Sequence, residues 1–246
     1  MKIIILAAGI GKRMSSVTEI IPKPLLPING IPIIDETLSN ISRLGFKEVT
    51  IVINHLSELI KEYCGNGKRF KISIKYVLQD KSNGTGAAVK KALERTIDDV
   101  MIIGGDTLFT FDHFKTVFES FKNSEIDGLI LLKKIPNDIL ARTSLVKINE
   151  NNIITKFIEK PKLHQIDSNT GSALLHLYNR TFLKYLDNIS ISERGEYELT
   201  EATKKMIEDK KIIKGVLMPT PLDLTEVKDL LIHNFSYIDN LLKNKG

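Results

Sequence analysis

Short apolar runs alternate with amphipathic segments through the first half of the chain. Ile3 to Leu6 is an uninterrupted run rich in β-branched residues, which is typical of a parallel strand covered by helices on both faces. The same reading predicts strands at 48–53, 71–77 and 100–103, and helices at 34–45, 57–63 and 86–94. Strands that alternate with helices predict an α/β fold with a largely parallel sheet.

The second half of the chain is less regular. We expect strands at 128–133, 145–148, 153–158 and 174–178, and helices at 180–186, 199–208 and 226–242. No internal repeat or low-complexity linker divides the chain. With 246 residues, 42% of them hydrophobic, the sequence favours one large domain, residues 1–246, over two small ones.

Composition narrows the classes of partner. The net charge is +5, but the cations are dispersed and are not interleaved with aromatic residues, which favours anionic small substrates over nucleic acid. No run approaches eighteen apolar residues, so we expect no membrane segment. Cys64 is the only cysteine, which excludes an internal disulfide and fits a reducing, cytoplasmic setting.

A glycine turn follows the first predicted strand directly. Gly9 and Gly11 would let main-chain N–H groups approach a polyphosphate, and Lys12, Arg13 and Lys23 would supply positive charge. The turn is neither of two familiar motifs. The dinucleotide fingerprint would need glycine where Met14 stands, and the P-loop would need a hydroxyl residue after Lys12.

Asp106 follows the predicted strand at 100–103 and a pair of glycines. Ligands of α/β sheets collect at the carboxyl ends of strands, where both Asp106 and the glycine turn would lie. A carboxylate there could hold Mg²⁺ against phosphate oxygens. The five histidines show no metal-ligand spacing and are expected at the surface or in packing: His55, His113, His164, His176 and His233.

Seven motifs, in this order and spacing, resemble those of the sugar-1-phosphate nucleotidylyltransferases. They are AAGIGKRM at 7–14, PKPLLPINGIPII at 22–34, QDKSNGTGAA at 79–88, GGDTLF at 104–109, EKP at 159–161, NTG at 169–171 and GEYELTEA at 195–202. The resemblance is greatest to glucose-1-phosphate uridylyl- and thymidylyltransferases and to the nucleotidyltransferase part of archaeal-type bifunctional enzymes. It covers nearly the whole chain.

The resemblance implies a Rossmann-like three-layer sandwich with a mostly parallel, mixed sheet. It assigns residues 1–110 mainly to the nucleotide and 111–246 mainly to the sugar. The C-terminal β-helix of some relatives, with its acetyltransferase activity, is not expected here. Dimers and tetramers are both common in the family, so a homo-oligomer is possible.

The implied reaction joins a nucleoside triphosphate to a sugar-1-phosphate with Mg²⁺. Arg13 and Lys23 are implied as catalytic cations, and Asp106 and Asp223 as metal ligands, although the tryptophan and glycine that usually neighbour the second aspartate are missing. Implied nucleotide-binding residues are Leu6, Ala8, Gly9, Gly11, Lys12, Arg13, Gln79, Gly84, Thr85 and Asp106. Implied sugar-binding residues are Glu159, Lys160, Asn169 and Gly171.

The resemblance also bears on the substrates. Gln79 would read uracil or thymine, whereas a guanylyl-transferring relative would more often have glutamate there. Gly84 and Gly86 would leave room for the base and ribose. Ser144 stands where relatives commonly have glycine, so glucose-1-phosphate and N-acetylglucosamine-1-phosphate both stay open.

Three alternatives remain at the level of sequence. One is a mannose-1-phosphate guanylyltransferase, and another is a regulatory subunit that binds a nucleotide sugar without turning it over. The third is a metal-dependent glycosyltransferase, which would typically show an Asp-x-Asp motif that does not occur near Asp106.

Overall fold

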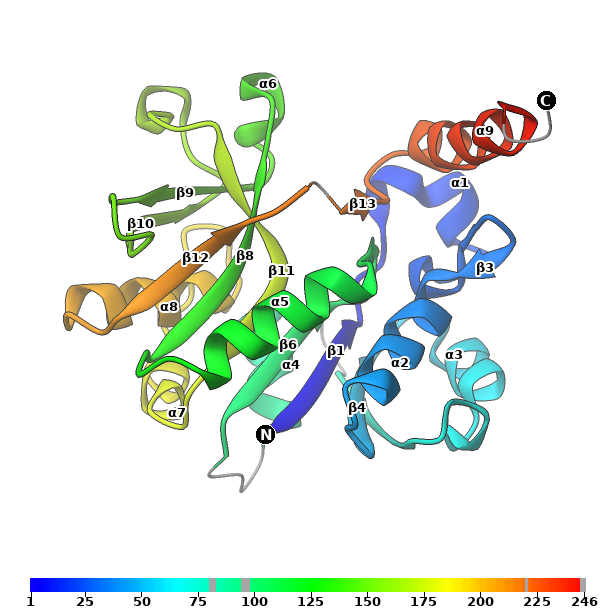
Figure 1. The fold of residues 1–246 in the computed structure, drawn as a ribbon, viewed down its shortest axis with the longest axis horizontal. Coiled ribbons are helices and arrows are strands. Elements are labelled where there is room, and N and C mark those ends of the chain that lie inside the picture. Colours follow the sequence, from blue (N-terminus) through cyan, green and yellow to red (C-terminus); the bar gives the residue numbers. More distant parts are fainter. Residues whose placement is uncertain (80–82, 94–97, 220, 244–246) are drawn as a thin grey trace.

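The centre of the fold is one mixed sheet with strand order β12-β8-β11-β6-β1-β4-β5 (Figure 1). The computed structural model describes residues 1–79, 83–93, 98–219 and 221–243. The strands of the sheet are β1 (Lys2–Ala7), β4 (Glu48–Ile53), β5 (Ser73–Leu78), β6 (Val100–Gly104), β8 (Gly128–Lys134), β11 (Thr170–Tyr178) and β12 (Ile213–Leu217). Neighbours pair in parallel except β11, which is antiparallel to β6 and β8. The predicted mostly parallel, mixed sheet is confirmed.

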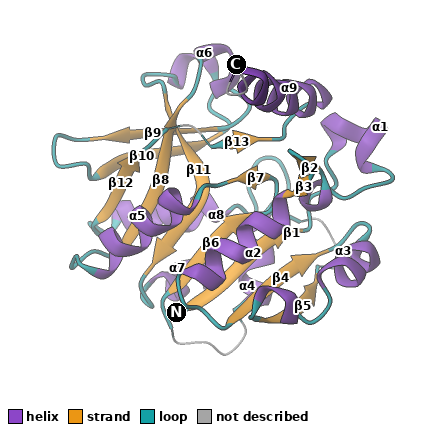
Figure 2. Ribbon diagram, turned by 45° about the vertical axis from the view of Figure 1, so that its right-hand side comes forward, coloured by secondary structure: helices purple, strands orange, loops and turns teal. Residues whose placement is uncertain are grey.

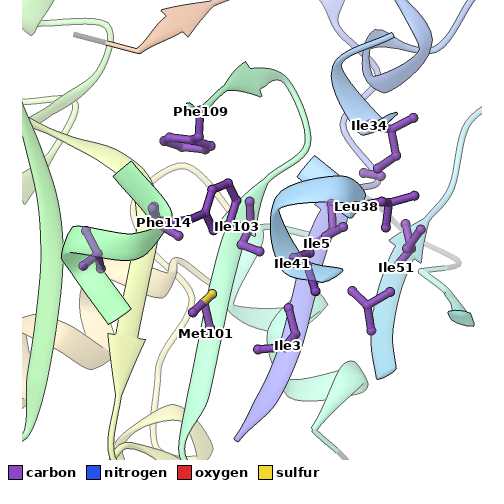
Figure 3. Close-up of a cluster of buried hydrophobic side chains, with 14 of the residues drawn as sticks. Ile3, Ile5, Ile34, Leu38, Ile41, Ile51, Met101, Ile103, Phe109 and Phe114 are labelled. Atoms are coloured by element: carbon purple, nitrogen blue, oxygen red, sulfur yellow. The ribbon is translucent and has the colours of Figure 1, made fainter. Parts of the chain in front are cut away.

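Helices cover both faces of the sheet, as the apolar run in β1 predicts. Ile3 and Ile5 face one cluster of buried side chains and Ile4 faces another. The first cluster includes side chains of α2 (Ile33–Arg43), α3 (Ser57–Cys64) and α5 (Phe111–Lys122), and Figure 3 shows part of it. The second includes α4 (Thr85–Ala92), α7 (Phe182–Asp187) and α8 (Leu199–Glu208). The result is a three-layer sandwich.

Smaller elements gather above the carboxyl ends of the parallel strands (Figure 2). They are α1 (Ser15–Thr18), β2 (Pro27–Ile28), β3 (Ile31–Pro32), β7 (Thr107–Leu108), α6 (Asn137–Leu140), β9 (Ser144–Ile148), β10 (Ile154–Glu159), β13 (Leu222–Asp223) and α9 (Val227–Lys243). A third buried cluster joins Met14 and Leu26 from the N-terminal loops to Leu224 near the C-terminus. Both ends of the chain therefore help to build this edge of the sheet.

The predicted elements are present, with ends that differ by a few residues. The predicted helix end at Glu94 lies outside the described residues. The longest elements without a prediction are α5 and β12, and the short elements α1, α6, β2, β3, β7 and β13 were not predicted either. The capping box of α5 pairs Thr110 with His113 rather than with a glutamate. Strand β12 contains Gly215, where a Cβ would lie 2.3 Å from the present position of Leu132 Cδ1 on β8, so the Leu132 side chain packs directly over this glycine.

None of the described helices is both long enough and apolar enough to cross a membrane.

Candidate active site

The carboxyl ends of β1 and β6 carry the glycine turn and Asp106. Leu6 pairs with Gly104 in the parallel ladder, and the Gly105 N–H donates to the Leu6 carbonyl oxygen at 3.0 Å. A Cβ on Gly105 would lie 2.7 Å from that oxygen, so glycine permits the close approach. Asp106 and Ala8 consequently line the same cavity.

Lys23 is buried beside Asp106, with 9% of its surface exposed. Its Nζ donates to the Leu224 carbonyl oxygen at 2.8 Å and lies 3.5 Å from Asp106 Oδ2. Gly11 makes room for this side chain, since its φ is +71° and a Cβ there would lie 3.0 Å from Lys23 Cε. The predicted cation is thus held next to a predicted metal ligand.

Asp223 reaches the same edge on β13, which pairs with β7. It lies opposite Thr107, whose Oγ1 donates to Asp223 Oδ1 at 3.0 Å. The other carboxylate oxygen accepts from Nζ of Lys133, which is itself buried. The Leu224 N–H donates to the Asp106 carbonyl oxygen at 3.1 Å, so the backbones of the two aspartates are tied together.

Asp106 and Asp223 form a donor set that suits Mg²⁺. They line one cavity and offer carboxylate oxygens, which this ion prefers. Mg²⁺ commonly takes one or two protein carboxylates and completes its shell with phosphate and water. Asp106 is half-exposed, whereas both oxygens of Asp223 already accept hydrogen bonds. The pair fits the ion, with Asp106 as the less constrained ligand.

A cavity of about 230 Å³ lies between the glycine turn and the start of α4. Its lining includes these predicted residues: Leu6, Ala8, Gly9, Lys23, Gln79, Gly84, Thr85 and Asp106. Gln79 is buried, and its Nε2 donates to Asn83 Oδ1 at 3.0 Å and to the Gly84 carbonyl oxygen at 3.1 Å. Because both amide hydrogens are donated within this loop, the carbonyl oxygen is the part of Gln79 that can meet a base.

The glycines of this loop pack on the loop that carries Tyr197. Gly84 has φ +104°, and a Cβ there would collide with the Tyr197 carbonyl oxygen. The Gly86 N–H donates to the same oxygen at 2.8 Å, and Ile189 lies 2.5 Å from where a Gly86 Cβ would be. Both glycines are thus needed for close packing on the Tyr197 loop, and their predicted role in leaving room for base and ribose stays a prediction.

A second cavity, of about 330 Å³, adjoins the first. Four residues line both cavities: Thr85, Asp106, Leu174 and Glu196. Glu159 and Lys160, the predicted sugar-binding pair, line the second. The predicted places of the two substrates therefore adjoin at Asp106.

Glu159 lies in an enclosed, acidic part of the second cavity. Burial, followed by the neighbouring Glu198, raises the pKa of Glu159 to about 7 against the opposing charges of Arg194 and Lys160. Arg194 lies 2.7 Å from Glu198 Oε1 and 3.7 Å from Glu196 Oε2. Glu159 can consequently act as a hydrogen-bond donor or acceptor near neutral pH.

Asn169 and Gly171 lie at the margin of this cavity rather than in its lining. Asn169 is exposed and accepts from Lys134 Nζ at 2.9 Å. Gly171 is needed where β11 passes β9, since a Cβ would lie 2.6 Å from the Ser144 carbonyl oxygen. The next side chain, Ser172, lines the cavity.

Arg13 lines a third cavity, of about 490 Å³, and Lys12 is exposed. Lys133 and Asp223 line both the second and third cavities, which therefore adjoin at this ion pair. The catalytic role of Arg13 stays a prediction, as does the contact of Lys12 with a nucleotide.

Several residues around the cavities received no role from the sequence: Lys133, Ser172, His176, Arg194, Glu196 and Glu198. Glu196 and Glu198 lie in GEYELTEA, so a signal for them was available. Lys133 is also visible as a charge at the end of the apolar run of β8. His176, expected at the surface or in packing, is buried with polar partners and lines the second cavity.

Comparisons with known proteins identify related sequences. The family model described as "Nucleotidyl transferase" matches residues 2–236. A bifunctional sugar-1-phosphate nucleotidylyltransferase/acetyltransferase of Sulfurisphaera tokodaii is 33% identical over 98% of this chain and 58% of that protein. A D-glycero-alpha-D-manno-heptose 1-phosphate guanylyltransferase of Campylobacter jejuni is 33% identical over 71% of this chain and 76% of that protein.

A solved structure extends the likeness to the fold. A crystal structure of a candidate glucose-1-phosphate thymidylyltransferase from Bacillus anthracis, in complex with sucrose, superposes with a TM-score of 0.83 at 25% identity. It covers 95% of this chain and 94% of that one. The chain spans little more than half the length of the bifunctional relatives that it matches. The predicted resemblance is confirmed, and the chain belongs to the nucleotidyl transferase family.

Proposed function

We propose that the protein transfers a nucleotidyl group from UTP or dTTP to a hexose-1-phosphate and releases pyrophosphate. Glucose-1-phosphate is the first candidate acceptor and N-acetylglucosamine-1-phosphate the second. The observation that carries the proposal is the meeting of two cavities at Asp106, with Lys23 lining one and Glu159 the other. Substrates bound in both cavities would bring their phosphates together at this carboxylate.

The chemistry requires alignment and positive charge more than a base. An oxygen of the sugar phosphate, already ionised, attacks the α-phosphorus of the nucleotide. The bond from this phosphorus to the oxygen that bridges to the β-phosphate breaks, and pyrophosphate leaves with the electron pair. Lys23, buried at the cavity wall, would stabilise the charge that develops on the α-phosphate.

Asp106 and Asp223 would hold Mg²⁺, which supplies charge neutralisation on phosphate oxygens when bound. The ion pair of Asp223 with Lys133 keeps that carboxylate oriented. Arg13 would grip the triphosphate or the departing pyrophosphate through its planar guanidinium.

The base preference rests on Gln79, whose carbonyl oxygen can accept from the ring N–H of uracil or thymine. A guanylyltransferase is the second candidate, and the heptose 1-phosphate guanylyltransferase relative favours it. Glucose-1-phosphate is favoured by the name of the structural neighbour, and the serine at 144 leaves other hexoses open.

The test is Mg²⁺-dependent pyrophosphate release across a grid of nucleoside triphosphates and hexose-1-phosphates, with Asp106→Asn beside the wild type. Release that needs one pyrimidine triphosphate and one sugar phosphate, and that is lost in the variant, would support the proposal. Release with GTP alone would favour the guanylyltransferase. Binding of a nucleotide sugar without release for any pair would favour the regulatory subunit.

A further inference from the structure

A chain of hydrogen-bonded side chains runs from the second cavity, the predicted place of the sugar and hereafter the sugar cavity, into the core. Ser172 Oγ lies 2.6 Å from His176 Nε2, and His176 Nδ1 lies 3.1 Å from the Tyr178 hydroxyl. That hydroxyl is 2.6 Å from Thr203 Oγ1 on α8. Ser172 and His176 both line the cavity, so one end of the chain faces the place predicted for the sugar.

The inner members of this chain are fully enclosed. His176 is 1% exposed, and Tyr178 and Thr203 are 0% exposed. Phe182 stacks on Tyr178 with ring centroids 4.2 Å apart, and Phe157 lies beside His176. Polar groups in such surroundings are costly unless they are paired, and each of these side chains has a hydrogen-bond partner.

The four hydrogen-bonded side chains, Ser172, His176, Tyr178 and Thr203, carry no charge at neutral pH. Burial lowers the pKa of His176 to about 3 and raises the pKa of Tyr178 well above its ordinary value. A neutral imidazole has one nitrogen that donates and one that accepts, so its tautomer sets the direction of every hydrogen bond in the chain.

Both tautomers leave the chain satisfied. In one, Nε2–H donates to Ser172 Oγ, Nδ1 accepts from Tyr178, and the Ser172 hydroxyl is free to donate to the Ala173 carbonyl oxygen at 3.2 Å or to a ligand. In the other, Ser172 donates to Nε2, Nδ1–H donates to Tyr178, and Tyr178 donates to Thr203. Ser172 can therefore offer the cavity a donor in the first state and an acceptor in the second.

A second hydroxyl lies next to Ser172. Ser144 Oγ accepts from the Ser172 N–H at 3.1 Å and keeps its own hydrogen to donate. Ser144 is also the cross-strand partner of Glu159, the predicted sugar-binding carboxylate. Three side chains with hydrogen-bonding capacity thus meet on the β9, β10 and β11 side of the cavity.

We propose that Ser172 and Ser144 recognise a hydroxyl group of the hexose, and that His176 and Tyr178 are positioning residues that let Ser172 donate to or accept from it. The inference rests on the proposed function, since it names what the sugar cavity selects. A hydroxyl both donates and accepts, which matches an adaptable serine beside a second one. A hexose without that hydroxyl would leave the serines unpaired and bind less well.

The experiment compares the preferred hexose-1-phosphate with its 2-, 3-, 4- and 6-deoxy analogues in wild type and variants. In the wild type, one deoxy analogue should lose about tenfold in kcat/KM relative to the parent. Ser172→Ala should remove most of that discrimination by lowering kcat/KM for the parent alone, with KM for the nucleotide unchanged. Tyr178→Phe, which keeps the ring but removes the partner of Nδ1, should reduce the discrimination about threefold.

Phe182→Leu is the matched control, because it disturbs the stacking on Tyr178 but no hydrogen bond of the chain. It should lower Tm and leave the ratio between parent and deoxy sugar unchanged. A ratio that moves in Phe182→Leu as much as in Tyr178→Phe would overturn the positioning role. An unchanged ratio in Ser172→Ala, in an active enzyme, would overturn the inference while the proposed function stands.

A binding measurement distinguishes failure of this inference from failure of the proposed function. If no pair of substrates reacts, the same ratio is measured as Kd for glucose-1-phosphate and its deoxy analogues, with ¹⁵N NMR of the His176 ring reporting its tautomer. A tautomer shift on binding that is lost in Ser172→Ala would support the inference for a protein that binds without catalysis. No binding of any sugar phosphate would overturn both proposals.

Discussion

On the proposed nucleotide side of the site, short turns at the ends of parallel strands bring backbone and small residues to Asp106. On the proposed sugar side, the cavity is enclosed by side chains from β9, β10, β11 and the loop before α8, together with Lys133 and Asp223 from more distant segments. The first side depends on local conformations that glycine permits. The second depends on networks that form only when the whole sheet is assembled, so the two sides should respond differently to substitution.

The largest expected effect is on the nucleotide side, at Asp106. Asp106→Asn should lower the rate of Mg²⁺-dependent pyrophosphate release by about 10³-fold, because the amide loses the charge that would hold the ion. Its half-exposed side chain should make the effect on stability small. Asp112→Asn, exposed in the first turn of α5, is the matched control. Equal activity of both variants would contradict the assigned role.

Gly84→Ala tests how far the two sides depend on each other. The added Cβ would collide with the Tyr197 carbonyl oxygen at a backbone conformation that L side chains rarely adopt. We expect a loss of about 3 kcal/mol in the free energy of unfolding and a higher KM for the nucleotide. Gly195→Ala, at φ +76° with no atom within 4 Å, should cost only about 1 kcal/mol. Urea unfolding of both variants measures the difference, and equal losses would exclude the collision as the cause.

Lys133→Met tests the ion pair where the second and third cavities meet. Removing the ammonium leaves the Asp223 carboxylate with one fewer partner in a partly enclosed place, and we expect about 2 kcal/mol less stability. The same substitution in an Asp223→Asn background should cost clearly less, since the charge to be paired is gone. Additive losses of stability in the double-mutant cycle would show that Lys133 and Asp223 have no interaction energy.

The smallest effect is the pH dependence from Glu159. Its pKa is raised from 4.5 to about 7, so the folded state holds this proton more tightly than the unfolded state. The stability from this group is complete below about pH 4.5 and is lost as pH rises through about 7. The pKa shift limits the loss in the free energy of unfolding to about 3 kcal/mol at most, and the partial exposure of Glu159 should reduce this loss to about 1 kcal/mol.

Glu159→Gln should remove this component of the stability profile, while Glu150→Gln, in the exposed turn between β9 and β10, should leave it in place. Thermal melts of the three proteins from pH 4 to pH 8 make the comparison. If the Tm values of the wild type and Glu159→Gln change in parallel over this pH range, burial does not raise the pKa of Glu159.

Much of the α/β pattern could be predicted because it is local. Ile3, Ile4 and Ile5 form a continuous apolar run, which only a strand covered on both faces can bury, and the structure places helices on both sides of it. Helix α5 was missed although Phe114, Val117 and Phe121 recur at helical spacing and are buried, so this signal was also local.

The sequence by itself determined the glycine turn after β1, the place of Asp106 after β6 and the family, since these depend on the order of residues along short segments. Only the tertiary structure decided that Lys133 pairs with Asp223, that Gly84 packs on Tyr197, and that His176 connects the second cavity to the core. Each of these contacts is between groups that come together only when the sheet folds. The burial that makes them energetically important does not exist until that sheet has formed.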